Sequence, residues 1–216
     1  MMCGLWMNRS IRFLGNLHPT FFIVRILQPE NKNPQILPET KYISMHNRET
    51  LLALSKDQLI ELIEIYAKNW LAMDGVWFQS VERKLGMDEA MYHDEEAWKR
   101  FTVTEARRIK KFLGLGEHPG LDGLSKALRL RFYANINEDE IEITKNTLIY
   151  TAKECFVQKA RAEKGMPYHP CKCVGIVEYS GFAKTIDDRI ACECISCYPD
   201  ITDSTCSCKW KFTINE

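Results

Sequence analysis

The stretch Phe132-Tyr-Ala-Asn-Ile136-Asn-Glu-Asp-Glu140-Ile-Glu-Ile143 divides this sequence of 216 residues into two parts with different periodicities. Before it, apolar residues recur at the three- and four-residue spacing of amphipathic helices. Within it and after it, short runs rich in β-branched and aromatic residues are typical of strands. Helices first and strands later indicate an α+β fold, in which N-terminal helices pack on a mostly antiparallel sheet with a cysteine-rich C-terminal segment.

The strongest helix signal lies upstream of this stretch. Ser55-x-x-Gln58 has the form of a capping box, and the helix that it starts is expected to end at Gly86. At roughly 30 residues such a helix is about 45 Å long, so it must pack along much of its length. Gly75 in its middle indicates a close approach of another backbone or of a ligand. Further helices on this side are predicted over residues 88–97, 104–113 and 121–130.

Downstream, short strands alternate with two more helices. Strands are predicted over 132–136 and 141–143, around a hairpin turn at 137–140, and again over 189–195 and 208–214. The helices between them are predicted over 155–164 and from about 174 to 186.

The first 44 residues differ from the rest. They carry five Lys/Arg against two acids, and prolines interrupt residues 28–40. We expect residues 1–44 to be a disordered extension, or upstream sequence translated from an early start codon, with Met45 as the natural start. Residues 45–216 are predicted to form a single α+β domain, helical over 45–130 and strand-rich over 131–216.

The composition excludes several classes of partner. Twenty-nine basic and 29 acidic residues cancel, which gives no electrostatic reason to expect nucleic acid or an anionic membrane as a partner. The N-terminus makes a poor secretion signal, and no apolar run reaches the roughly 18 residues of a membrane span. The nine cysteines are therefore expected to be thiols in the cytoplasm.

Seven of those cysteines crowd into 38 residues, as Cys171-x-Cys173, Cys192-x-Cys194-x-x-Cys197 and Cys206-x-Cys208. Side chains at i and i+2 of a strand share a face, so pairing 189–195 with 208–214 would bring thiols from two strands together. Four thiolates can then bind one tetrahedral centre, and they favour zinc, Cu(I) or iron–sulfur. The alternative is that these cysteines are small buried apolar residues. His169 is either a further ligand or a loop histidine.

A second candidate site lies on the long helix. Asp74, Phe78 and Glu82 recur at i, i+4 and i+8 beside Trp77, and Glu105 of a later helical segment could meet them. A buried carboxylate must find donors, stay protonated or bind something. These five residues predict either a small-molecule pocket with an aromatic wall or an ion-pair lock between helices, with Arg107 and Arg108 as counter-charges.

Several motifs in order resemble a bacterial and archaeal family of uncharacterised cytosolic proteins. The matching residues lie within roughly 50–214: Asp74-Gly-x-Trp77-Phe78, Cys155-x-Val157-Gln158-x-Ala160-Arg161, Pro170-Cys171-Lys172, Ile186-Asp187, Glu193-Cys194-x-x-Cys197, Pro199-Asp200 and Cys208-x-Trp210-x-Phe212. The closing strand is also similar, more distantly, to L-2-amino-thiazoline-4-carboxylate hydrolase-like proteins and to the 4-vinyl reductase domain. This resemblance implies that Cys171, Cys194, Cys197 and Cys208 are the metal ligands, whereas Cys173, Cys192 and Cys206 depart from the pattern.

Three functions follow as hypotheses. The first is a small-molecule-binding protein stabilised by a zinc-like thiolate site, with homo-oligomerisation left open. The second is a hydrolase of a C–N bond, in which metal-bound water or the thiolate of Cys194 or Cys208 attacks and Asp74 or Glu82 carries the proton. The third is a redox sensor at Cys194 and Cys197. The sequence lacks phosphate-loop, dinucleotide and zincin motifs.

Overall fold

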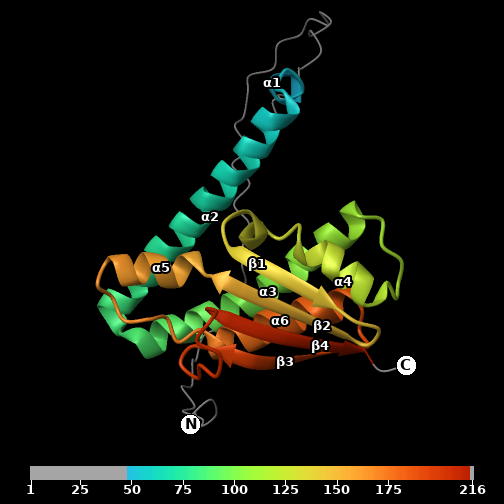
Figure 1. Ribbon diagram of the computed structural model, residues 1–216. Coiled ribbons are helices and arrows are strands. Elements are labelled where there is room, and N and C mark those ends of the chain that lie inside the picture. The colour runs from blue at the N-terminus through green and yellow to red at the C-terminus, as the bar shows by residue number, and fades with distance from the viewer. Residues whose placement is uncertain (1–47, 215–216) are drawn as a thin grey trace, which may run out of the picture. The chain divides into compact units, whose positions relative to one another are not determined.

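A computed structural model describes residues 48–214 of the chain (Figure 1). The chain divides into two units, residues 1–53 and 54–216. The described part of the first unit is one short helix, α1 (Arg48–Leu52). The expectations for residues 1–44 lie outside the described residues.

The second unit begins with the predicted long helix, α2 (Lys56–Leu85). Its capping box is present: Gln58 N donates to Ser55 Oγ at 3.1 Å, and Ser55 N donates to Gln58 Oε1 at 2.9 Å. The helix ends at Gly86, whose φ of 93° disfavours residues with a side chain. The sequence therefore predicted both ends of α2 correctly.

The next helix corrects a prediction. Residues 88–97 and 104–113 form one continuous helix, α3 (Met87–Phe112), rather than two. Thr102 and Val103, which lie between the two predicted helices, have low helix propensity. Thr102 is fully buried, however, and its Oγ1 donates to the Glu178 carbonyl at 2.8 Å. Tertiary packing therefore outweighs the local propensity.

The stretch that begins at Phe132 also differs from its prediction. After α4 (Gly120–Leu128), residues Phe132–Asn135 form a 3-10 helix, η1, instead of a strand. The reason is packing, because the ring of Tyr133 stacks on Trp98 of α3 at 5.7 Å. The hairpin joins β1 (Glu138–Ile143) to β2 (Thr147–Glu154), so its turn lies after residue 143 and not at 137–140.

The sheet has the order β1-β2-β4-β3, and every neighbouring pair is antiparallel. Its other strands are β3 (Ile190–Cys197) and β4 (Cys208–Ile214), so the predicted pairing of these two segments is confirmed. Helices α5 (Phe156–Glu163) and α6 (Lys172–Ile186) follow β2 in the chain. The α+β class is confirmed.

Helix α6 packs between α3 and the inner face of the sheet (Figure 1). Two glycines allow this approach. A Cβ on Gly175 would lie 2.5 Å from the Trp210 ring on β4, and a Cβ on Gly181 would lie 2.8 Å from Thr102 on α3. The core therefore tolerates no side chain at either point.

None of the helices within residues 48–214 combines the length and the apolar character that crossing a membrane requires.

Candidate functional site

A cavity of about 110 Å³ lies among α2, α3, α6 and the inner face of the sheet. A dry cavity of ~150 Å³ in another protein binds benzene, so this one has the scale of a single-ring molecule. Five aromatic side chains form most of its apolar wall: Phe78, Trp98, Tyr133, Tyr179 and Trp210. Tyr179 and Trp210 stack at 4.7 Å, which fixes that wall.

Asp74 of α2 is one of the few charged groups in the cavity wall. Burial and, to a smaller extent, the nearby charge of Asp94 raise the pKa of its carboxyl from 3.8 to about 6, against the opposing effect of His169. Among residues 48–214 it has no hydrogen-bonding or ion-pair partner. The wall therefore presents an unpaired carboxyl group to the cavity.

Glu178 of α6 is the second carboxyl group in the wall, and it is paired. Arg131 Nη2 lies 2.7 Å from Glu178 Oε1, and Arg131 Nε donates to Glu105 Oε2 at 2.9 Å. Burial raises the pKa of Glu178 to about 7, although Arg131 opposes this. One buried guanidinium thus holds two buried carboxylates and joins η1 to α3 and α6.

His169 and Asp94 form a third polar group in the wall, with Asp94 Oδ2 3.3 Å from His169 Nε2. Gln158 fixes the histidine backbone on both sides: its Nε2 donates to the His169 carbonyl at 2.8 Å, and its Oε1 accepts from His169 N at 2.9 Å. Burial disfavours imidazolium, but hydrogen bonds to Asp94 and Cys171 outweigh burial and raise the pKa of His169 to about 9.

Cys171 stands at the N-terminus of α6, next to this histidine. Its Sγ lies 3.5 Å from Cys197 Sγ and accepts from Gln158 Nε2 at 3.4 Å. The hydrogen bond with Cys197, followed by those with His169 and Gln158, lowers the pKa of Cys171 to about 5 against the effect of burial. Cys171 is therefore a thiolate candidate at neutral pH.

Cys197 is the centre of the thiol cluster. Its Sγ forms a hydrogen bond with Cys171 Sγ at 3.5 Å, and its interactions with the side chains of Cys171, Cys194 and Cys208 raise its pKa. In a regular strand, residues 194 and 197 would face opposite sides because their separation is odd. A bulge between Cys194 and Ser196 adds one extra residue to β3 and so reverses this alternation. Cys194 pairs with Trp210 and Cys197 pairs with Cys208, which places both cysteines on the same side of the sheet.

The chemistry of these donors fits a soft metal. Four thiolates at about 2.3 Å from a zinc ion are about 3.8 Å from one another, close to the 3.5 Å between Cys171 and Cys197. In the part of the chain that the structure describes, however, the only three-residue ligand group within a mutual 4.8 Å is His118, Asp187 and Asp188. Cys197 is the shared neighbour of Cys171, Cys194 and Cys208. Binding one metal ion would therefore require the sulfur atoms of these three to move closer to one another.

The other cysteines differ from these four. Cys155 lines the cavity, and burial raises its pKa to about 12. Burial likewise raises the pKa of Cys192 to about 12 and that of Cys206 by less. These three thiols stay protonated at neutral pH, in keeping with the alternative of cysteine as a small buried residue.

The predicted pocket residues divide into two groups. Asp74 and Phe78 line the cavity. Glu82 instead forms a bidentate ion pair with Arg161, with distances of 3.0 and 2.7 Å, and this hydrogen bonding lowers its pKa. Glu105 pairs with Arg131, and Trp77 is 48% exposed beside His93. The counter-charges are therefore Arg131 and Arg161, and not Arg107 and Arg108 as predicted. Pocket and helix lock are both present, side by side.

Of the two close approaches predicted at Gly75, that of another backbone is absent, and that of a ligand stays a prediction. A Cβ there would meet only Gln79 Nε2, at 4.0 Å. Gly75 lines the cavity, so its missing side chain leaves space for a ligand.

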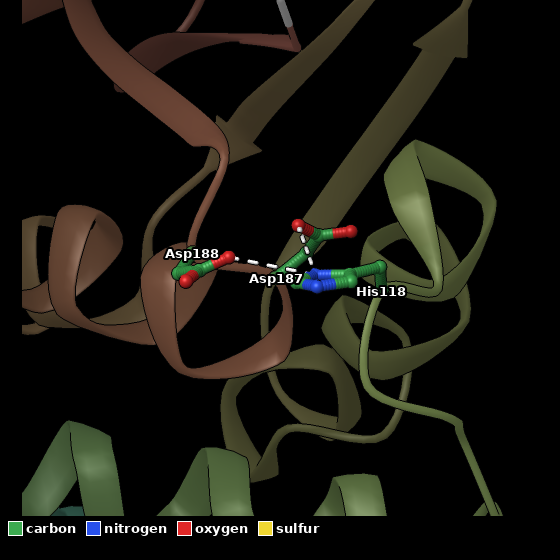
Figure 2. Close-up of side chains that lie close together, drawn as sticks. All are labelled: His118, Asp187 and Asp188. Carbon is green, nitrogen blue, oxygen red and sulfur yellow. Dashed lines mark ion pairs between the residues drawn. The ribbon is translucent and has the colours of Figure 1, made fainter. Parts of the chain in front are cut away.

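A separate cluster joins the loop before α4 to the turn after α6. His118 Nδ1 lies 3.6 Å from Asp187 Oδ1 and 3.5 Å from Asp188 Oδ1. Figure 2 shows these two ion pairs. The buried Asp187 carboxylate also accepts from Gly120 N and from the guanidinium of Arg189. These bonds lower its pKa. Because a guanidinium already occupies Asp187, this cluster anchors α4 and is a poor cation site.

Sequence reasoning missed Asp94, Gln158 and Glu178 in the site. Each lies on a helix among ordinary charged residues, so spacing alone does not single it out. A signal did exist for Gln158, since Cys155-x-Val157-Gln158 is one of the motifs on which the family resemblance rests.

The family of unknown function DUF6125 matches residues 52–214, which include the whole cavity and the thiol cluster. The chain belongs to this family. The predicted resemblance to a family of uncharacterised proteins is therefore confirmed. No curated protein sequence matches the chain.

Among solved structures, the DUF6125 chain is similar to the crystal structure of the phenol-responsive sensory domain of the transcription activator PoxR with phenol. The identity is 13%, the match covers 66% of this chain and 73% of that chain, and the TM-score is 0.42. A likeness at this level carries no inference about function.

Proposed function

We propose that this protein binds a small, ring-sized molecule that carries an amino group. The observation that supports this most directly is the unpaired carboxyl group of Asp74 in an aromatic-walled cavity of about 110 Å³. Ligand sites are typically concave and apolar, with a few polar groups that fix orientation.

The charges of the wall favour a cation. Asp94 is already paired with His169, and Glu178 with Arg131, so Asp74 is the carboxylate left to bind a ligand. An ammonium group beside aromatic faces gains a further ~1–2 kcal/mol from cation–π attraction when it is desolvated. A neutral donor such as a hydroxyl group gains only the hydrogen bond, so an amine is the better ligand.

A thiolate-bound zinc ion is the second part of the proposal, held by Cys171, Cys194, Cys197 and Cys208. A closed site with four protein ligands supplies folding energy and no open position for substrate. Cys171 and Cys208 also line the cavity, so such a site would stiffen one end of it.

The ligand proposal is tested with a matched pair of probes. Benzylammonium and its neutral analogue benzyl alcohol are titrated into the full chain by calorimetry, with the fluorescence of the cavity tryptophans as a second readout. We expect benzylammonium to bind at least about tenfold more tightly, and Asp74→Asn to remove that difference. Asp57→Asn, in the exposed first turn of α2, is the control. Failure of both probes to bind would contradict the proposed function.

The metal proposal is tested by native mass spectrometry and elemental analysis of the full chain purified under reducing conditions. About one zinc or iron ion per chain is expected, lost in Cys197→Ser and retained in Cys206→Ser. A folded chain without metal would exclude the site. If the thiols of the metal-free protein then oxidised reversibly, redox sensing at Cys194 and Cys197 would replace the metal proposal.

One arrangement favours a second candidate function, a thiol hydrolase. Cys171, His169 and Asp94 follow one another as nucleophile, proton carrier and orienting acid. The thiolate would form a C–S bond at an amide-like carbon, and the C–N bond would break as His169 gives its proton to the leaving nitrogen. Water would then hydrolyse the thioester. The predicted resemblance to hydrolase-like proteins agrees with this chemistry and stays a prediction.

The two candidates require different states of Cys171, because a ligand in a closed metal site is not a nucleophile. Cys171→Ser separates them. Loss of metal with loss of stability supports the binding protein, whereas an intact metal content and fold with loss of C–N hydrolysis supports the enzyme.

A further inference from the structure

Helix α2 carries a row of apolar residues that the ligand site does not use. Leu59, Ile63, Tyr66, Trp70, Met73 and Trp77 follow one another at spacings of 4, 3, 4, 3 and 4. Spacings that alternate between four and three residues are those of a coiled-coil seam, in which positions a and d alternate. Ile63, Trp70 and Trp77 take one of these positions, and the other three residues take the second.

Five of the six seam residues are open to solvent in the described structure, and Leu59 is half-buried. Ile63, Tyr66 and Met73 are 53%, 61% and 69% exposed. Trp70 stacks on Phe101 and Trp77 contacts His93, yet about half of each indole remains exposed. Large apolar patches of this kind on a protein surface mark interaction sites.

The seam is a different face from the one that builds the core. The buried residues of α2 are Ala67, Leu71 and Phe78. At 100° per residue, the seam is centred about 90° around the helix from these residues. The N-terminal turns of α2 precede its first buried residue, Ala67, and extend beyond the sheet (Figure 1). Within the described residues, the fold therefore covers only part of this row, at Trp70 and Trp77.

We propose that a second copy of this chain covers the seam, with the two α2 helices packed antiparallel. One register brings every seam residue opposite a partner of the other type: Ile63 opposite Met73, Tyr66 opposite Trp70, and Leu59 opposite Trp77. The residue numbers of each pair are centred on 68, so the two-fold axis passes at the level of Lys68. All six layers are filled only in this register, and larger residues face smaller ones at Leu59–Trp77.

The area and the flanking residues also suit a second copy. Ile60 and Val76, which flank the seam, are 56% and 64% exposed. Seven half-exposed large side chains leave on the order of 800 Å² per copy, which equals the ~800 Å² per partner of a stable interface. The flanking positions are mostly uncharged, so identical copies do not repel each other, and antiparallel helix dipoles attract.

The assembly is tested by sedimentation equilibrium of the full chain over micromolar concentrations. We expect twice the chain mass for the wild type and a single-chain mass for the double variant Ile63→Glu/Met73→Glu. Phe112→Glu, at an 81% exposed apolar residue outside the seam, should remain a dimer. Circular dichroism of each variant verifies that the fold is intact.

Orientation is tested with a spin label incorporated as an unnatural amino acid at Asp57. The antiparallel register places the two labelled backbones about 33 Å apart along the axis, from 22 residues at 1.5 Å each. Parallel helices would place them within about 10 Å. A wild-type chain that stays monomeric, because residues 1–47 or another protein cover the seam, would overturn the proposal, and a short label distance would overturn the register. Ligand binding by a monomer would leave the proposed function intact.

Discussion

Asp74 in the cavity wall and Asp187 at the turn after α6 carry the same side chain in opposite surroundings. Asp187 is buried and accepts hydrogen bonds from Gly120 N and from Arg189, which lower its pKa. Asp74 is partly buried without a partner among the described residues, and its pKa rises to about 6. The fold supplies hydrogen-bond donors to the carboxylate of Asp187. Among the described residues it supplies none to the carboxylate of Asp74.

The difference separates structural from functional acids without reference to position in the sequence. Both aspartates lie near a histidine and a second acid: Asp187 near His118 and Asp188, and Asp74 near His169 and Asp94. Only in the first group does a guanidinium complete the set. A buried carboxylate without a donor destabilises the folded state, and its position in an aromatic cavity is what the proposed function rests on.

The largest effect is expected from Asp187→Asn. The change weakens charge-assisted bonds to α4 and to Arg189, so the free energy of unfolding should fall by about 2–3 kcal/mol. Urea denaturation measures this loss. Asp188→Asn is the control, because that side chain is 76% exposed and should cost under about 0.5 kcal/mol. Equal effects of the two variants would contradict the structural role of Asp187.

Asp74→Asn is expected to have the opposite sign. Removing a desolvated carboxylate whose pKa is raised by about 2 units should stabilise the folded protein at pH 7 by about 2 kcal/mol. The same variant should lose the preference for benzylammonium over benzyl alcohol. Thermal melts and calorimetry measure the two effects. A loss of stability would mean that Asp74 has a partner in the folded protein, and the contrast with Asp187 would fail.

The pH dependence of stability sharpens the contrast. The folded pKa of Asp74 lies above its unfolded value, so its contribution is present below about pH 4 and is lost as the pH rises to about 6. Glu178 extends this loss to about pH 7. The folded pKa of Asp187 lies below its unfolded value, so its contribution is lost below about pH 4. We therefore expect the urea midpoint of Asp74→Asn to fall less than that of the wild type between about pH 4 and pH 6. The midpoint of Asp187→Asn should fall less than that of the wild type below about pH 4. Urea denaturation from pH 3 to pH 8 measures both differences.

The smallest effect is expected at Gly75, which follows Asp74 in the sequence. Gly75→Ala should stabilise α2 by under about 1 kcal/mol, because the new Cβ would meet only Gln79 at 4.0 Å. Gly123→Ala, in α4, would place its Cβ 2.4 Å from Pro119 and should destabilise. Weaker ligand binding by Gly75→Ala would further support the cavity. Thermal melts measure both variants. If their melting temperatures shifted in the same direction, the inferred difference in packing between the two glycines would be wrong.

Local signals were sufficient for much of the fold. The capping box and Gly86 set both ends of α2, and alternation located β3 and β4 to within about two residues. Local signals failed where packing decided the backbone. Thr102 continues α3 because its hydroxyl reaches α6, and Phe132 begins a 3-10 turn because the aromatic side chains there pack against α3.

The candidate site was predictable in part for a similar reason. Asp74 and Phe78 stood out because a carboxylate among large apolar residues is unusual, and both line the cavity. Glu82 and Glu105 stood out equally, but Arg161 and Arg131 neutralise them from distant parts of the chain. Sequence spacing shows which acids share a helix face, and it does not show which of them meet a guanidinium.

The sequence by itself determined the α+β class, the long α2, and the concentration of thiols in one segment, because each depends on neighbours along the chain. The tertiary structure alone decided which acid stays unpaired, that His169 meets Asp94, and that the bulge before Ser196 turns Cys194 and Cys197 to the same face. These features depend on contacts between residues tens of positions apart. Such contacts are set by packing of the whole unit, and local periodicity carries no record of them.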